Sequence, residues 1–341
     1  MGKTKPSGRR AGRQGENNGD GPITTASLVA EMHEIADRLL KDGASRGDVK
    51  ILSRAMKELR YAFKVFAEFR GRRKVSIFGS ARSKPTDPTY GLAVEFGRAM
   101  AAAGWMVITG ASGGIMEAGH VGAGREHSMG VNILLPFEQD ANPVIAGDRK
   151  LVHLKYFFTR KLLFVKESDA VGLFPGGFGT MDEGFEVLTL VQTGKREMIP
   201  LVFIEQPGSD YWRSWEDHVR RRLLGGGYIS PEDLGLYKVT DNVADAVNEV
   251  LTFYRVFHSM RFVHERLVLR LERRISDELL DRLNHDYRDI LVDGQFVQTG
   301  ALNQETGDEH LAAMPRLVFH FDRKSLGRLR QVINLINESG A

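Results

Sequence analysis

The chain has 341 residues, of which 42% are hydrophobic and 27% are charged, and it contains no cysteine. This composition is typical of a globular protein, and the length allows one large domain with an appendage or two domains. The absence of cysteine excludes disulfides, thiolate metal ligands and a cysteine nucleophile. Because no apolar run is long enough to cross a bilayer and no apolar signal core follows the N-terminus, we expect a cytoplasmic protein without a membrane partner.

The formal net charge of +3 is confined to the first 20 residues, which hold five basic and two acidic side chains. The remaining 321 residues balance 42 basic against 42 acidic side chains. We therefore predict a disordered basic tail over residues 1–22, which is more typical of a solubilising extension than of an arm that binds nucleic acid. A nucleic-acid partner is not expected for the folded body.

Two helical patterns follow over residues 23–71, the predicted N-terminal helical segment. Their apolar residues recur at spacings that are typical of amphipathic helices. These residues are Leu28, Met32, Ile35 and Leu39 in the first pattern, and Leu52, Leu59, Phe63 and Phe66 in the second. Their apolar faces are expected to pack on the core or on a partner subunit.

Short apolar runs alternate with helical patterns over residues 72–256. The predicted strands are residues 74–78, 105–109, 129–135, 150–154, 169–174 and 199–204. The predicted helices are residues 88–103, 114–125 and 158–167, a helix ending near 193, and residues 210–224 and 241–256. Strands that read as continuous apolar runs between helices indicate a parallel sheet covered on both faces. We predict a Rossmann-like, doubly wound α/β domain, in which ligands bind beyond the carboxyl ends of the strands.

Residues 257–341 have a different pattern. The predicted elements are a strand at 266–271, a helix at 276–287, a hairpin around Asp293 and Gly294, a strand at 316–322 and a helix at 325–337. This β-α-β-β-β-α order indicates a small C-terminal α+β module resembling ferredoxin-like or ACT-type regulatory domains. A regulatory module and a packing extension are equally compatible with the pattern.

Three predicted strands end in turns of glycine and small polar residues. They are FGSAR (78–82), TGASGGIME (109–117) and PGGFGTMDE (175–183). A nicotinamide-binding domain places GxGxxG after its first strand, where this chain has Gly79 and Ser80, and the chain has no GxxxxGK[ST] motif. The dinucleotide and P-loop interpretations are therefore disfavoured.

The third turn contains Gly176, Gly177, Phe178, Gly179 and Thr180 at the predicted start of a helix. Amides that point outward from a helix start, the helix dipole and a threonine hydroxyl together suit a phosphate. Alternatively, the glycines only allow a tight turn, and Thr180 is an ordinary N-cap.

A pair of cations, Arg160 and Lys161, lies at the start of the preceding helix in YFFTRK (156–161). In a parallel sheet this helix start also lies near the carboxyl edge, where Glu183 follows the third turn. Two cations, a phosphate-type turn and a carboxylate at one edge indicate a sugar-phosphate site. Alternatively, the cation pair lies on a solvated helix face. Thr189, six residues after Glu183, could face the same crevice.

At these residues the chain resembles the Lonely Guy (LOG) family, long described as "lysine decarboxylase-like". The family signature PGGxGTxxE, preceded by an RK pair, is matched by Pro175, Gly176, Gly177, Gly179, Thr180 and Glu183 after Arg160 and Lys161. The resemblance covers roughly residues 72–256, with the segments GSAR, GIMEA and QTGK in order. It implies a Rossmann-like, usually dimeric protein that hydrolyses the N-glycosidic bond of nucleoside 5′-monophosphates, releasing the base and ribose 5-phosphate.

The resemblance implies that Arg160 and Glu183 are the catalytic pair. Glu183 would stabilise an oxocarbenium-like state at C1′ and activate water. The residues expected to bind the nucleotide or its phosphate are Lys161, Gly176, Gly177, Phe178, Gly179, Thr180, Thr189, Gly79, Ser80, Gly114 and Glu117. At the second turn Ala111 and Ser112 stand where the family commonly has glycine, so the approach of the backbone to sugar or base is expected to differ there.

The leading prediction is a homodimeric phosphoribohydrolase acting on AMP or a cytokinin riboside monophosphate. The alternative is a nucleotide-binding sensor without turnover and with a regulatory C-terminal module. A third interpretation, a pyridoxal-phosphate decarboxylase, requires a Schiff-base lysine, for which only Lys161 is a candidate. No cofactor or metal is expected, because the ten histidines are scattered and no HExxH or comparable ligand cluster occurs.

Overall fold

The computed structural model describes residues 24–134, 141–305 and 308–339 of the chain. The predicted basic tail at 1–22 therefore lies outside the described residues. The chain divides into two compact units, Met1–Arg54 and Ala55–Ala341. Within the described ranges, no helix has both the length and the apolar character that a membrane span requires.

The two predicted N-terminal helices are present: α1 spans Thr25–Lys41 and α2 spans Arg46–Ala67. Thr24 and Ser27 cap the start of α1 reciprocally, since Ser27 N donates to Thr24 Oγ1 (3.1 Å) and Thr24 N donates to Ser27 Oγ (2.9 Å). The last residues of α2 belong to the second unit, where Ala62 and Phe66 join the hydrophobic core. This part of the segment packs on the core, which is one of the two alternatives expected for it.

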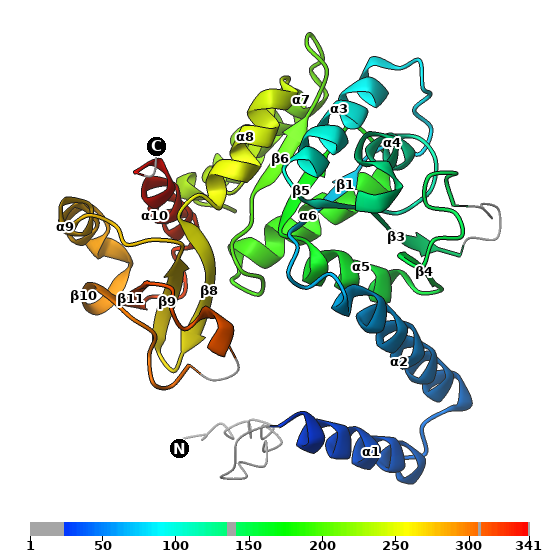
Figure 1. Cartoon of the computed structure of the whole chain (residues 1–341), viewed down its shortest axis with the longest axis horizontal. Coiled ribbons are helices and arrows are strands. Elements are labelled where there is room, and N and C mark those ends of the chain that lie inside the picture. The colour runs from blue at the N-terminus through cyan, green and yellow to red at the C-terminus, as the bar shows by residue number, and fades with distance from the viewer. Residues whose placement is uncertain (1–23, 135–140, 306–307, 340–341) are drawn as a thin grey trace, which may run out of the picture. The chain divides into compact units, whose positions relative to one another are not determined.

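The second unit is built around a parallel sheet, to which the described residues contribute seven strands in the order β4-β3-β2-β1-β5-β6-β7 (Figure 1). The strands are β1 (Lys74–Phe78), β2 (Met106–Thr109), β3 (Ser128–Ile133), β4 (Leu151–Leu154), β5 (Ala170–Leu173), β6 (Leu201–Ile204) and β7 (Lys238–Thr240). Every residue of β1, β2, β5 and β6 is buried, because helices cover both faces. The predicted doubly wound α/β fold is confirmed. The sequence pattern misses β7, whose three residues include a single buried one.

Helices pack on both faces of this sheet. The helices are α3 (Pro88–Ala102), α4 (Ile115–His127), α5 (Phe157–Glu167), α6 (Phe178–Gln192), α7 (Tyr211–His218) and α8 (Val243–Phe253). Phe96 of α3, Ile115 of α4 and Val250 of α8 belong to one hydrophobic cluster, whereas Leu163 of α5 and Val187 of α6 belong to another. The predicted helix 210–224 is divided, since a π-helical turn at Val219–Leu224 follows α7.

The strand order reverses between β1 and β5. Strands β2, β3 and β4 follow on one side of β1, whereas β5, β6 and β7 follow on the other. The helices that come after β1 and β5, α3 and α6, pack on opposite faces of the sheet. The chain therefore leaves these two neighbouring strands in opposite directions, which opens a crevice at their carboxyl ends.

The C-terminal module is an antiparallel sheet with two helices. Its described strands follow the order β10-β11-β9-β8. In chain order the elements are β8 (Phe257–Val263), β9 (Arg266–Leu271), α9 (Asp277–Asp286), β10 (Leu291–Thr299), β11 (Arg316–Phe321) and α10 (Leu326–Glu338). The predicted α+β class is confirmed, but the predicted β-α-β-β-β-α order is wrong. The observed β-β-α-β-β-α order is that of a ferredoxin-like fold with its fourth strand placed first.

Two local features explain this difference. β8 reads FHSMRFV and buries only every third residue, a period that predicts neither a strand nor a helix. The predicted hairpin around Asp293 and Gly294 is also wrong, because both residues lie within β10, whose pairing with β11 shifts register on either side of Asp293. Gly294 has a φ of 70°, so the turn-like pair forms a bulge and not a reversal.

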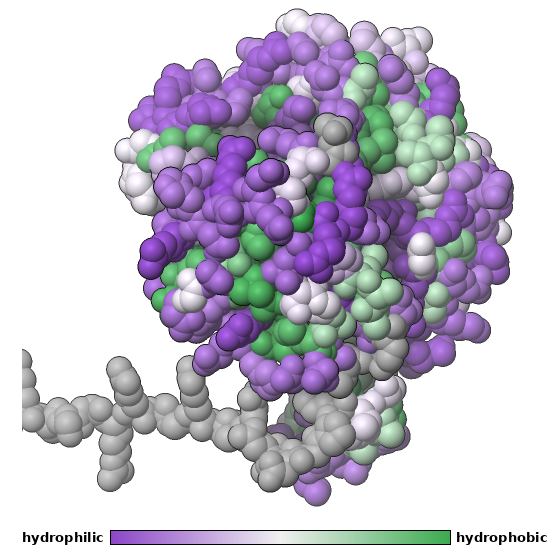
Figure 2. Space-filling view, turned by 60° about the vertical axis from the view of Figure 1, so that its left-hand side comes forward, coloured by the Kyte–Doolittle hydropathy of each residue, from purple (hydrophilic) through white to green (hydrophobic). Residues whose placement is uncertain are grey.

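Asn337 of α10 fastens the module to the parallel-sheet domain. Its Oδ1 accepts hydrogen bonds from Val256 N (2.8 Å) and Phe257 N (3.0 Å), and its Nδ2 donates to Phe253 O (2.6 Å). These residues are all buried, and one hydrophobic cluster includes side chains of both parts. The face of the molecule seen in Figure 2 is largely hydrophilic, with smaller groups of hydrophobic residues among the hydrophilic ones.

Candidate active site

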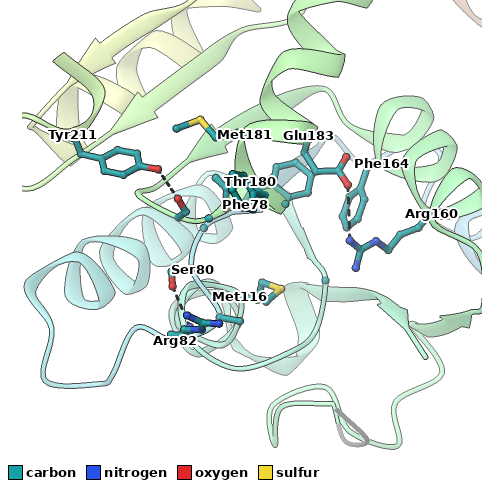
Figure 3. A pocket seen from close by; sticks show the side chains of 17 residues that line it. Phe78, Ser80, Arg82, Met116, Arg160, Phe164, Thr180, Met181, Glu183 and Tyr211 are labelled. Atoms are coloured by element: carbon teal, nitrogen blue, oxygen red, sulfur yellow. Dashed lines mark hydrogen bonds and ion pairs between the residues drawn. The ribbon is translucent and has the colours of Figure 1, made fainter. Parts of the chain in front are cut away.

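A cavity of about 720 Å³ lies at the carboxyl ends of β1 and β5, where the strand order reverses (Figure 3). It includes most of the residues predicted from the glycine-rich turns and from the charged pair. The predicted residues that line it are Gly79, Ser80, Arg160, Gly176, Gly177, Phe178, Gly179, Thr180 and Glu183. The structure thus brings the first turn, the third turn and the predicted catalytic pair into one place.

The first and third turns are held together by backbone hydrogen bonding and close packing. Ser80 N donates to Pro175 O at 3.1 Å. A Cβ at Gly176 would lie 2.1 Å from Thr180 Oγ1 and 2.9 Å from Ser80 N, so this position requires glycine. Tyr211 adds a third constraint, because its hydroxyl donates to Gly176 O. The loop is therefore fixed before any ligand arrives.

Gly177, and not Thr180, is the N-cap of α6, and no side chain caps this helix. The prediction of Thr180 as an N-cap is therefore wrong; Thr180 is buried in the first turn of the helix. Thr180 N donates to Gly177 O at 3.0 Å, so among the described residues it is the amides of Phe178 and Gly179 at this helix start that are available to an anion, and the helix dipole favours negative charge there. Phe178 in this loop is 96% exposed and stands at the edge of the cavity.

Glu183 lies within the first two turns of α6 and is only 2% exposed. Its Oε1 is 3.9 Å from Arg160 Nη2, and its Oε2 is 3.6 Å from Lys161 Nζ. Burial raises the pKa of Glu183, while the charges of Lys161 and Arg160 oppose this shift. In the described part of the chain, Glu183 Oε2 and Arg160 Nε have no hydrogen-bond partner. Buried polar atoms of this kind are normally satisfied, so both are available to a bound molecule or to water.

Arg160 reaches the cavity from α5, and the rings of Phe157 and Phe164 flank its guanidinium at 5.0 and 5.9 Å from the ring centroids. Burial lowers the pKa of Arg160, and the nearby carboxylate of Glu183 opposes the shift. Arginine remains charged throughout the accessible pH range. The aromatic rings therefore hold a permanent cation beside Glu183.

Lys161 lies off the cavity lining, although it is expected to contact the nucleotide. Its Nζ is 2.7 Å from Glu186 and 2.8 Å from Asp182, in addition to its contact with Glu183. Partial burial lowers the pKa of Lys161, but the hydrogen bonds to Asp182 and Glu186 outweigh this and the net shift is upward. Consecutive residues of a helix point about 100° apart, and of this pair Arg160 lines the cavity whereas Lys161 does not.

The second turn contributes Gly110 and Met116 to the lining, but neither Ala111 nor Ser112. Ala111 has a φ of 60° and is fully buried, so it keeps the conformation that glycine usually provides, at a cost of about 1–2 kcal/mol. Its methyl group packs with Ile145 and Leu151, away from the cavity. Ala111 is expected from the sequence to alter how closely the backbone approaches the sugar or base, but its side chain does not line the cavity.

Gly114 acts between the turns and does not line the cavity. It has a φ of 65°, and a Cβ there would lie 2.2 Å from Ser80 O. Ile115 N donates to the same carbonyl at 3.0 Å. Gly114 thus allows the second turn to pack directly against the first.

Glu117 and Thr189 lie outside the cavity. Glu117 is half-buried on α4, and Thr189 is exposed on α6 with its hydroxyl bonded to Phe185 O at 2.7 Å. Six residues rotate a helix by about 600°, so the side chain of Thr189 points about 120° away from that of Glu183. The expectation that Thr189 faces the crevice of its own chain is therefore wrong.

Several lining residues have no role in the sequence prediction. They are Phe78, Ala81, Arg82, Gly110, Met116, Phe164, Met181 and Tyr211. Arg82 belongs to the GSAR turn and could have been chosen for its position. Tyr211 follows β6 and carries no local signal, because only the sheet order brings it beside Gly176.

The lining bears on two other kinds of site, a pyridoxal-phosphate site with a Schiff-base lysine and a metal site. None of the residues that line this cavity in the described chain is a lysine, and Lys161 is engaged by three carboxylates. Likewise, no group of three or more histidine or acidic side chains within the described ranges is arranged to hold a metal ion. A Schiff base in this cavity therefore has no lysine to form it.

The family described as "Possible lysine decarboxylase" matches residues 111–250. The chain is also 32% identical, over 165 residues, to a cytokinin riboside 5′-monophosphate phosphoribohydrolase of Mycobacterium tuberculosis (strain ATCC 25618 / H37Rv), a match that covers 46% of this chain and 82% of that protein. The chain belongs to the Lonely Guy family. Arg160 and Glu183 both fall within the residues that the family match covers, whereas the turn after β1 and the C-terminal module lie outside it.

Two solved structures are similar to this LOG chain at low identity. The molybdenum cofactor carrier protein of Chlamydomonas reinhardtii is 20% identical, with a TM-score of 0.37 and coverage of 53% of this chain and 96% of that one. The molybdenum cofactor binding protein of Rippkaea orientalis is 17% identical, with a TM-score of 0.36 and coverage of 52% and 94%. These likenesses are too distant to bear on function.

Proposed function

We propose that the chain hydrolyses the N-glycosidic bond of nucleoside 5′-monophosphates, of the AMP or cytokinin riboside monophosphate type, to give the free base and ribose 5-phosphate. One observation carries the proposal. Glu183 is a buried carboxylate whose Oε2 has no hydrogen-bond partner among the described residues, and it shares a cavity with a glycine loop at the start of its own helix. The family relative from Mycobacterium tuberculosis, named as a phosphoribohydrolase, supports the same reaction.

In this reaction water forms a bond to C1′ while the bond from C1′ to the base nitrogen breaks. Positive charge develops on the ribose, and the bonding electrons leave with the base. The ionised carboxylate of Glu183 stabilises the oxocarbenium-like ribose and accepts a proton from the attacking water, as carboxylates do in glycoside hydrolysis. The departing base nitrogen takes up a proton, so the reaction consumes one water.

Arg160 contributes a fixed charge on the same side of the cavity as Glu183. Its Nε is buried and has no hydrogen-bond partner within the described ranges, and the rings of Phe157 and Phe164 limit its movement. A preorganised donor of this kind orients the nucleotide and stabilises charge that develops in the transition state. Because Lys161 also lies 3.6 Å from Glu183, Arg160 can bind a ligand without leaving the carboxylate uncompensated.

The loop Gly176–Thr180 holds the 5′-phosphate in this proposal. The free amides of α6 and the dipole of this helix suit an anion, and binding energy from the remote phosphate positions the bond that breaks. A nucleotide keeps its phosphate and its C1′ several bonds apart. The loop and Glu183 can therefore act on one ligand without the carboxylate opposing the phosphate.

The proposal includes a homodimer in the cytoplasm, without a nucleic-acid partner. Large apolar side chains are exposed on α5 and α6, the helices that carry the catalytic pair, and a second subunit would cover them. They are Phe157, Phe158, Leu162, Phe178 and Phe185. Light scattering on the purified full chain tests this part, and a strictly monomeric mass over the working concentrations contradicts it.

Incubation of the protein with AMP and with a cytokinin riboside monophosphate, followed by chromatography for the free base and ribose 5-phosphate, tests the activity. Equal amounts of base and ribose 5-phosphate are expected. The alternative function, a nucleotide sensor without turnover, requires nucleotide binding by calorimetry and no released base. Its motivation is the C-terminal module, which shares a hydrophobic cluster with the sheet that forms the site.

A further inference from the structure

The cavity has two polar ends, and Glu183 and Arg160 occupy only one of them. Ser80 and Arg82 also line the cavity, and Figure 3 shows them on the opposite side of the labelled group from Arg160. Thr180 and the loop before it line the same cavity. A ligand that reaches Glu183 at one end therefore has a second charged group available at the other.

Arg82 is a cation without an acidic partner in the part of the chain that the structure describes. Throughout the described ranges, no carboxylate lies within ion-pair distance of its guanidinium, whereas Arg160, the other cation in the lining, faces Glu183. The side chain of Arg82 is exposed, so an incoming anion has no internal ion pair to break. An arginine of this kind at a cavity edge is free to bind a ligand.

The backbone beside Arg82 places further donors at this end. Arg82 N donates to Ser80 Oγ at 3.1 Å, so the oxygen serves as an acceptor and the hydroxyl proton remains free to be donated. Ser80 N binds Pro175 O and so ties this turn to the loop that begins at Gly176. The guanidinium, the hydroxyl and the free amides of α6 thus belong to adjoining parts of one cavity wall.

The charge of a phosphate ester requires more than the helix start provides. A phosphate monoester carries about −1.5 to −2 at pH 7, and a helix N-terminus supplies only about half a positive charge. A guanidinium supplies a full charge and can bind two phosphate oxygens at once. We propose that Arg82 binds the 5′-phosphate and thereby makes the site prefer nucleotides over unphosphorylated nucleosides. This inference rests on the proposed function.

The test compares AMP with adenosine in Arg82→Ala. The comparison is made in a Glu183→Gln background, where the ligand is not consumed. Calorimetry is expected to show that Arg82→Ala weakens the binding of AMP and of ribose 5-phosphate about 10- to 100-fold. Adenosine binding is expected to change less than about twofold, because adenosine has no group for Arg82 to bind. In the otherwise wild-type protein, KM for AMP rises by a similar factor and kcat changes little.

Two further variants control for charge and folding. Arg82→Lys retains the charge but not the two-pronged geometry, so an intermediate loss is expected. Lys84→Ala removes an exposed cation two residues away, outside the lining, and should leave both ligands unaffected. Thermal unfolding of each variant should match the wild type, because Arg82 makes no side-chain contact that supports the fold in the described structure.

The outcomes separate this inference from the proposed function. If the wild type hydrolyses AMP and Arg82→Ala does not weaken AMP binding more than adenosine binding, the role of Arg82 is overturned and the activity stands. If the wild type releases no base but Arg82→Ala still weakens AMP binding and leaves adenosine binding unchanged, the activity is overturned and the role of Arg82 stands. Equal weakening of AMP and adenosine, or no measurable binding of AMP and ribose 5-phosphate to the Glu183→Gln protein, contradicts the inference.

Discussion

Lys161 Nζ lies 3.6 Å from Glu183 Oε2, yet Lys161 does not line the cavity that Glu183 faces. It also contacts the more exposed carboxylates of Asp182 and Glu186. Burial raises the pKa of Glu183, and Lys161 is the strongest of the charges that oppose the rise. We therefore expect Lys161 to act through Glu183, by keeping it ionised, and not through the ligand.

Replacement of Lys161 by methionine tests this role. The pKa of Glu183 should rise further in Lys161→Met, because the strongest charge that favours its ionised form is removed and only Arg160 then opposes the effects of burial, Asp182 and Glu186. The acidic limb of the profile of kcat against pH should move to higher pH, with activity recovered at alkaline pH. Lys166→Met, which removes an exposed lysine of the same helix, is the control. An unchanged acidic limb would exclude the role.

Replacement of Glu183 by glutamine should lower kcat by about 10²- to 10⁴-fold, because the amide cannot accept the proton from water. Binding of AMP should be largely retained, since the phosphate loop and Arg82 are unchanged. Steady-state kinetics and calorimetry give the two values. Glu186→Gln alters a carboxylate one turn further along α6 and should cost much less activity. Turnover that survives Glu183→Gln would remove Glu183 from the mechanism.

Two glycines of the same loop should respond oppositely to alanine. In Gly176→Ala the new Cβ would overlap Thr180 Oγ1 and Ser80 N, so the free energy of unfolding should fall by about 1–3 kcal/mol. In Gly179→Ala the new Cβ meets no atom within 4 Å, and a helical position gains up to about 1 kcal/mol. Urea denaturation of the two variants measures the difference. Equal stabilities would mean that the loop relaxes around the new methyl group.

The buried imidazole of His120 should make stability depend on pH. Burial lowers the pKa of His120 from 6.5 to about 4, although hydrogen bonds to Met129 and Asn142 oppose the shift. Between these pH values the unfolded chain binds a proton that the folded chain does not. The free energy of unfolding should therefore fall as pH falls through this window, by on the order of 3 kcal/mol in total.

Chemical denaturation from pH 7.5 to 4.5 measures this slope in the wild type and in His120→Gln. The variant should show a shallower slope, since one of the shifted groups is gone. Some slope should remain, because burial also lowers the pKa of His258 to about 4, with Arg73 adding to the effect. If His120→Gln keeps the full slope, His120 is not the origin of the acid sensitivity.

The sequence predicts the parallel sheet well, because most of its strands are short apolar runs that alternate with helical patterns. It predicts the C-terminal module less well, since β8 and β10 lack a strand signal of that kind. The pair Asp293 and Gly294 illustrates the difficulty: the same two residues suit a hairpin turn and a bulge, and only the pairing with β11 decides between them.

The site shows the same division. The proximity of Arg160 and Glu183 could be predicted from the sequence, because both follow the pattern that places them near the carboxyl edge of a parallel sheet. The placement of Lys161 off the cavity lining depends on the rotation of α5 about its own axis, which packing determines and a motif does not record. Tyr211 reaches Gly176 only because β6 lies beside β5. Long-range contacts of this kind leave no mark in the local sequence.

The hydrogen bonds of Asn337 give the C-terminal module a particular connectivity. The chain enters the module at Val256 and Phe257, and Asn337, near the end of α10, binds the amides of these same two residues. The first and last parts of the module are therefore joined by hydrogen bonds at one place, and the polypeptide between them forms a closed loop. A protein shortened at residue 256 would be cut at a single peptide bond, yet it would lose the partners of Phe253 O and Val256 N and uncover the apolar side chains around them.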